Sequence, residues 1–122
     1  MKKTGLLLFA FLFIVQGIMP VASSAEVQEG EASYIADRLD GNRTASGETY
    51  DKNAFSAAHR TLPFGTKVIV TYLETGQSVE VVINDRGPHV KGRIIDLSSA
   101  AARKIGLLEA GHGRVTLEVV NP

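Results

Sequence analysis

The sequence contains no cysteine and no tryptophan, and its 13 Lys and Arg residues equal its 13 Asp and Glu residues. The lack of cysteine excludes a disulfide framework, a thiol nucleophile and thiolate metal ligands. The balanced charge argues against nucleic-acid binding, which usually requires a basic stripe. The sequence also has no glycine-rich motif of the Walker or dinucleotide-binding type. We therefore expect a protein that works without nucleic acid and without a cofactor.

The first 25 residues have the three parts of a secretory signal peptide. Lys2 and Lys3 precede an apolar run over residues 5–15, and small residues lead up to a cleavage site after Ala25. The run is shorter than the roughly 20 residues that cross a bilayer. The alternative is an uncleaved membrane anchor. We expect export, cleavage after Ala25 and no stable membrane anchor, which leaves residues 26–122 as one domain with a slight acidic excess.

Segments rich in β-branched residues predict four or five short strands, over residues 32–36, 67–73, 78–84, 93–97 and 114–120. Residues 98–105 favour a helix, which Ser98 or Ser99 caps and Gly106 ends. The acidic residues 26–31 indicate a disordered lead-in. The polar residues 37–60 indicate a long irregular segment, and such segments in small domains are often functional. This order of elements is typical of a closed barrel or a tight sandwich.

Candidate functional side chains lie in two of the predicted loops. Glu48 and Asp51 are three residues apart in the long polar segment, where the alternative is a solvated turn. Asp85 follows the predicted strand 78–84 and precedes Arg86 and a Gly-Pro pair, so it can face a groove or cap its own backbone.

His59 can be a general acid/base or a structural histidine, because the unperturbed imidazole titrates near neutral pH. The other histidines, His89 and His112, show no spacing that would converge on a metal ion with it. We expect no metal site.

Five blocks of residues occur in a recognisable order: 30–34 (GEASY), 44–48 (TASGE), 57–66 (AAHRTLPFGT), 83–88 (INDRGP) and 92–98 (GRIIDLS). Together they closely resemble the rare lipoprotein A (RlpA) family, over nearly all of the chain after the leader. The resemblance implies an all-β fold, a six-stranded double-psi β-barrel with one or two short helices. It also implies an endolytic peptidoglycan lytic transglycosylase, a lyase that cleaves the MurNAc-β-1,4-GlcNAc bond and leaves 1,6-anhydro-MurNAc ends. The preferred substrate would be glycan strands stripped of stem peptides.

The resemblance also implies roles for individual residues. The family's catalytic positions fall on Asp85, Glu48 and His59. Substrate contacts are expected from Arg86, Asn84, Thr44 and Tyr34. We expect Asp85 to be the acid/base, and Glu48 to be its partner or to stabilise positive charge at the anomeric carbon. His59 and Arg86 would orient Asp85 or the glycan.

The sequence departs from the family pattern in several places. It has no cysteine after the leader to carry a lipid, and it ends at Pro122 without the peptidoglycan-binding SPOR domain of many members. Ile35 replaces a common aromatic, and Asp40 stands where histidine is usual. We expect a monomer in the periplasm, cell envelope or extracellular space.

A second function stays open at this point, because one fold serves many functions. The chain can be a non-catalytic, expansin-like module that binds glycan or loosens the wall. Such a binder needs aromatic platforms more than a pair of carboxylates. The aromatic residues after the leader are few, namely Tyr34, Tyr50, Phe55, Phe64 and Tyr72. This favours the enzyme.

Overall fold

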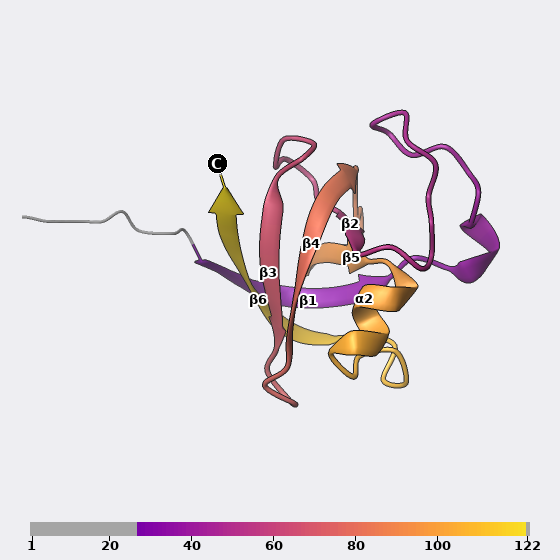
Figure 1. The fold of residues 1–122 in the computed structure, drawn as a ribbon. Helices are drawn as coiled ribbons and strands as arrows, with labels where there is room; N and C mark the ends of the chain where they lie inside the picture. The colour runs from indigo at the N-terminus through magenta and orange to yellow at the C-terminus, as the bar shows by residue number, and fades with distance from the viewer. Residues whose placement is uncertain (1–26, 122) are drawn as a thin grey trace, which may run out of the picture.

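The computed structural model describes residues 27–121. Six strands close into one barrel in the order β1-β5-β2-β4-β3-β6, which Figure 1 shows with helix α2 beside it. The pairs β1–β5 and β2–β4 are parallel, and the other neighbours are antiparallel. The strands are β1 (Val27–Tyr34), β2 (Ser56–Ala58), β3 (Lys67–Tyr72), β4 (Ser78–Asp85), β5 (Arg93–Leu97) and β6 (Gly113–Asn121). The predicted barrel is confirmed, and the sandwich alternative is wrong.

The interior of the barrel is filled by alternate residues of the strands, as the twofold period of a strand requires. β4 shows this most clearly, because Val79, Val81 and Ile83 are buried while the residues between them are exposed or half-exposed. Helix α2 (Ser99–Lys104) closes one side with Ala101 and Ala102, which are fully buried. The predicted helix start is confirmed, because the Ser98 side chain accepts a hydrogen bond from the Ala101 N–H at 3.3 Å.

Two elements differ from the sequence prediction. The expected disordered lead-in is wrong for residues 27–31, because β1 begins at Val27 and pairs with β6 from there. The glutamates of this stretch occupy exposed or half-exposed positions, so a polar composition is compatible with the strand. Strand β2 was not predicted, because Ser-Ala-Ala has little strand preference. It is a strand because β4 and β5 pair with it on either side.

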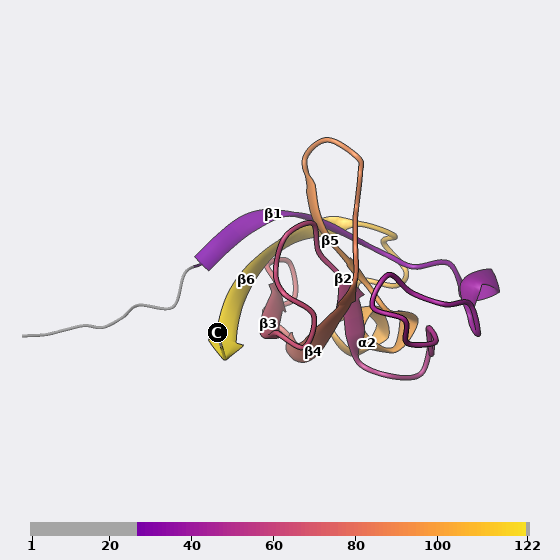
Figure 2. The same cartoon turned by 90° about the horizontal axis from the view of Figure 1, so that it is seen from above.

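Two segments extend away from the barrel, and Figure 2 shows both of them from above. The first, residues 35–55, joins β1 to β2 and contains a short 3₁₀ helix, η2 (Asp37–Leu39). The second, residues 86–92, joins β4 to β5. No helix within residues 27–121 is long and apolar enough to cross a membrane. The predicted signal peptide lies outside the described residues.

Candidate active site

A tight turn over residues 43–49 packs against the end of β4. Its ends are joined by a bridge between Arg43 and Thr49, and the Thr44 N–H donates to the Glu48 carbonyl at 2.7 Å. Gly47 adopts a φ of 93°, a left-handed conformation that glycine accepts without steric cost. The Ser46 N–H then donates to the Asn84 carbonyl at 3.3 Å. The turn is therefore fixed both internally and onto the barrel.

This turn supplies a hydrogen bond to the carboxylate of Asp85. Oδ1 of Asp85 accepts the Ala45 N–H at 2.9 Å and the Arg86 N–H at 2.8 Å. The side chain is half-buried, at the point where β4 ends. Two donors on one oxygen orient the carboxyl group and leave its other oxygen, Oδ2, available to a ligand.

The same turn brings Glu48 to the neighbouring residue of β4. The Asn84 side-chain amide donates to Oε1 of Glu48 at 3.2 Å. Thr44 contributes from within the turn, because its hydroxyl donates to the Glu48 carbonyl at 2.8 Å. The structure thus gathers four of the residues that the sequence singles out, Glu48, Asn84, Asp85 and Thr44. Asp51 lies apart from them and accepts the Asn53 N–H at 2.9 Å in a local turn.

The imidazole of His59 is buried, and both of its nitrogens have partners in the protein. Nδ1 accepts the Thr61 and Leu62 N–H groups at 3.2 and 3.1 Å, so the proton is on Nε2, which donates to Oε1 of Gln28 at 3.1 Å. Burial, followed by the positive charges of Arg86 and Arg60, lowers the pKa of His59 below its ordinary value. His59 is therefore held as the neutral imidazole.

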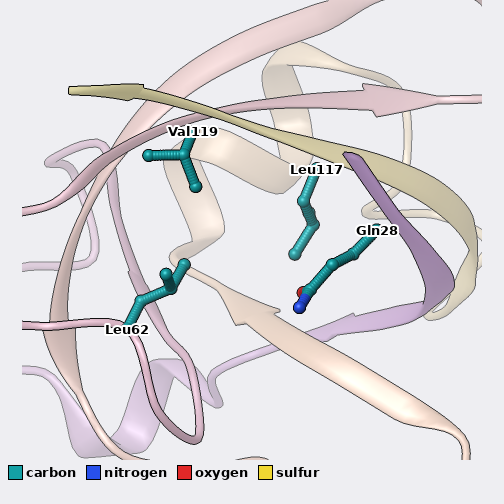
Figure 3. Close-up of a pocket in the computed structure, with 4 residues that line it drawn as sticks. All are labelled: Gln28, Leu62, Leu117 and Val119. Carbon is teal, nitrogen blue, oxygen red and sulfur yellow. The ribbon is translucent and has the colours of Figure 1, made fainter. Parts of the chain in front are cut away.

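His59 reaches Asp85 through its backbone and not through its ring. Its N–H donates to the Asp85 carbonyl at 3.1 Å. The ring faces Gln28, whose side chain also borders a small pocket with Leu62, Leu117 and Val119 (Figure 3). This arrangement suits a residue that positions the end of β4.

The guanidinium group of Arg86 is held beside Asp85. Its carbon lies 4.0 Å from the centre of the Phe64 ring, and Nη1 donates to the His59 carbonyl at 3.2 Å. Arg60, close by, donates only to carbonyl oxygens, those of Pro88 and Val90, at 2.6 and 2.8 Å. Neither arginine forms an ion pair with a carboxylate of residues 27–121. Both therefore retain positive charge for an anionic ligand.

Tyr34 is the seventh residue that the sequence assigns to the site. It ends β1, and its half-buried ring packs against the core cluster. Within the described chain it forms no side-chain hydrogen bond with the turn or with Asp85. Residues 27–121 also contain no group of three His, Asp or Glu side chains that could hold a metal ion.

The fold and the site define a class of protein, a double-psi β-barrel in which one turn contacts Asn84 and Asp85 at the end of β4. Residues 27–117 match the family described as "Lytic transglycolase". The chain is 54% identical over 99 residues to the probable endolytic peptidoglycan transglycosylase RlpA of Synechocystis, covering 81% of this chain and 31% of that protein. The Treponema pallidum protein of the same name is 48% identical over 122 residues, covering 100% of this chain and 38% of that protein. The chain belongs to the RlpA family of double-psi β-barrels, and it spans about a third of the length of these relatives.

Solved structures of other proteins share the barrel. The Streptomyces papain inhibitor superposes with a TM-score of 0.64 at 26% identity, over 79% of this chain and 96% of that one. An expansin of Clavibacter michiganensis superposes with a TM-score of 0.64 at 20% identity, over 79% of this chain and 51% of that one. The second likeness concerns the fold alone.

Proposed function

We propose that this chain is an exported lytic transglycosylase that cleaves the MurNAc-β-1,4-GlcNAc bond of peptidoglycan. Asp85, as the acid, gives its proton to the glycosidic oxygen while the bond from that oxygen to C1 of MurNAc breaks. The 6-hydroxyl of the same MurNAc bonds to C1, and its proton passes to the Asp85 carboxylate. The products are a free GlcNAc 4-hydroxyl and a 1,6-anhydro-MurNAc end. Neither water nor a metal ion enters this sequence, unlike two-carboxylate hydrolysis.

The observation that carries the proposal is the turn over residues 43–49, which holds Glu48 and Asp85 at one end of the barrel. The related proteins of Synechocystis and Treponema carry the name "Probable endolytic peptidoglycan transglycosylase RlpA", which supports this chemistry. Glu48 stabilises positive charge at the anomeric carbon in this proposal. His59 acts as a positioning residue, because both ring nitrogens are engaged by the protein.

Arg86 supports a preference for glycan strands stripped of stem peptides. The lactyl group of MurNAc ends in a free carboxylate only where no peptide is attached. A guanidinium group without a carboxylate partner, adjacent to the acid, can bind that anion with two parallel hydrogen bonds. In a MurNAc that bears a stem peptide, the lactyl group ends in a neutral amide. It therefore cannot form the charge-assisted hydrogen bonds with Arg86.

The proposed substrate places the mature protein in the bacterial cell envelope or outside the cell. The signal peptide expected from residues 1–25 would direct the export. The substrate is a polymer and the fold is small, so a monomer suffices.

The test is incubation of residues 26–122 with purified peptidoglycan, intact and stripped, followed by mass spectrometry of the soluble products. We expect products lighter by one water than hydrolytic ones at the MurNAc end. Asp85→Asn and Glu48→Gln should abolish or strongly reduce them, by about 100-fold or more for the acid. Reducing-end products would instead identify a hydrolase. Binding to insoluble wall without any product would support the expansin-like alternative.

A further inference from the structure

The loop over residues 86–92, between β4 and β5, takes part in the proposed function only through Arg86. Figure 2 shows that it stands clear of the barrel. At its β5 end the loop is attached through its backbone, because the Val90 carbonyl accepts the Arg93 N–H at 3.1 Å and the Gly92 carbonyl accepts the Glu31 N–H at 3.2 Å. The β4 end, which carries Arg86, is held by side chains instead.

Arg60, which lies shortly after β2, holds the loop from outside. Its Nε donates to the Pro88 carbonyl at 2.6 Å and its Nη2 donates to the Val90 carbonyl at 2.8 Å. A guanidinium group keeps its N–H donors in one rigid plane, so it can bridge two carbonyl oxygens in a fixed geometry. Hydrogen bonds from a charged donor are also about twice as strong as those between neutral groups. Arg60 thus fixes the chain at two points, one on each side of His89.

The two segments are joined by contacts in both directions. The His59 N–H donates to the Asp85 carbonyl at 3.1 Å, and Nη1 of Arg86 donates back to the His59 carbonyl at 3.2 Å. Arg60, the next residue after His59, then binds the loop beyond Arg86. Gly87, which separates Arg86 from these contacts, has a φ of 127° and no side chain to restrain it. The direction of the chain on either side of Gly87 therefore depends on the two arginines.

We propose that Arg60 is a positioning residue that sets the preference for stripped glycan. This inference rests on the proposed function, in which Arg86 binds the lactyl carboxylate of MurNAc. Arg60 fixes the loop beyond Gly87, and the fixed loop keeps the Arg86 guanidinium beside Asp85 before the substrate arrives. A group that is already ordered loses less conformational freedom on binding, so it binds its ligand more tightly. Without the two hydrogen bonds of Arg60, the cost of ordering Arg86 would offset part of the affinity for the carboxylate.

The geometry of Arg60, and not its charge alone, is what this role requires. Its Nε and Nη2 donors are both engaged by carbonyl oxygens, so this edge of the guanidinium group is not open to a carboxylate. Lysine keeps the positive charge, but a single ammonium nitrogen does not reproduce the planar pair of donors. Arg60→Lys therefore removes the positioning and retains the electrostatic attraction for an anion.

The test measures KM of the protein, residues 26–122, on stripped glycan strands and on the same strands coupled to methylamine. The second KM should exceed the first by about 10-fold or more in the wild type. We expect a ratio below about 3 in Arg60→Lys, because the discrimination requires an ordered Arg86. Arg103→Lys, at the exposed end of α2, is the matched control and should keep the wild-type ratio. A merely structural role would lower kcat or the melting temperature and leave the ratio unchanged.

A second measurement does not depend on activity. Lys91 is exposed in the loop, so trypsin can cut the bond to Gly92 when the loop opens locally. We expect this bond to be cut at least about fivefold faster in Arg60→Lys than in the wild type, as followed by mass spectrometry. Arg103→Lys should be cut there at the wild-type rate. Circular dichroism establishes that each variant is folded.

Each outcome decides the inference. A folded Arg60→Lys protein with the wild-type KM ratio, or with the wild-type rate of cleavage after Lys91, would overturn it and leave the proposed function standing. If Arg60→Lys does not fold, Arg60→Gln decides by the same two measurements. Equal KM values for the wild type on both substrates would overturn this inference together with the role of Arg86. Wild-type protein that yields no anhydro products would overturn the proposed function as well.

Discussion

At the scale of single residues, His59 has an environment that makes stability depend on pH. Its pKa is lowered in the folded protein, so the unfolded chain binds a proton at a higher pH, near 6.5, than the folded chain does. Above that pH the imidazole is neutral in both states and contributes no dependence. As the pH falls through 6.5, His59 of the unfolded chain binds a proton and the unfolded state is favoured. This effect ends when the pH falls below the pKa of His59 in the folded protein.

We therefore predict that the free energy of unfolding decreases as the pH is lowered from about 7.5 to about 5.5. Urea denaturation followed by circular dichroism measures it. His59→Gln should be less stable at every pH but should lose most of this slope. The control is His89→Gln, because His89 is exposed, and it should keep the wild-type slope. An equal slope in His59→Gln and the wild type would show that another group is responsible.

Arg86 allows a prediction about substrate charge. Coupling methylamine to the lactyl carboxylates of stripped glycan removes their charge and leaves the sugars unchanged. We expect this to raise KM for the wild-type protein by about 10-fold or more, as for a lost charge-assisted pair. Arg86→Gln should respond equally to both substrates. Arg103→Gln, at the exposed end of α2, should behave like the wild type. Equal KM values for the wild type on both substrates would assign Arg86 another role.

At the scale of elements, Ser98 connects α2 to β2 and to the long segment before it. Its hydroxyl donates to the Ala54 carbonyl at 2.5 Å, and its oxygen accepts the N–H groups of Ser56 and Ala101, each at 3.3 Å. Ser98→Ala removes the helix cap and takes this hydroxyl partner away from the N–H of the buried Ser56 and from the Ala54 carbonyl. We predict a loss of about 2–4 kcal/mol in the free energy of unfolding. Ser78→Ala, on the surface, should cost under about 0.5 kcal/mol, and similar losses for both would contradict the prediction.

The elements that sequence predicts well are those whose stability is local. The β3–β4 hairpin and α2 have runs of β-branched residues or alanines with turn and cap residues at their ends. β2 has no such signal, because the neighbouring strands β4 and β5 impose its conformation. The order of elements left a closed barrel and a sandwich open, and only the resemblance implied the six-stranded double-psi barrel, since pairing between distant strands leaves no local pattern.

The residues of the candidate site also differ in how well the sequence predicts them. Glu48 and Asp85 could be singled out because they fall within blocks that resemble the RlpA family, since a carboxylate in a loop or at a strand end is ordinary by itself. The direction of the His59 ring could not, since it depends on Gln28 in β1, 31 positions earlier.

At the scale of the whole molecule, β1 closes the barrel by pairing with both β5 and β6. This closure brings Ser33 to Asp96 and Gln28 to His59. Strand β1 therefore contacts His59, a residue of the candidate site that the turn over residues 43–49 does not hold. A substitution that disturbs the packing of β1 against β5 should therefore lower the free energy of unfolding of the whole barrel.

Gly30, buried in β1, provides a test of this closure. A β-carbon at Gly30 would lie 2.7 Å from Cγ2 and 3.0 Å from Cγ1 of Ile94 in β5, closer than packed atoms tolerate. We predict that Gly30→Ala lowers the free energy of unfolding by about 1–3 kcal/mol, as overpacking does. Ile94→Ala removes both of the opposing atoms. Combined with Gly30→Ala it should therefore cost less than the sum of the two single changes by about 1 kcal/mol or more. Urea denaturation of the four proteins of this cycle measures the coupling, and additive losses would mean that β1 shifts away from β5 without strain.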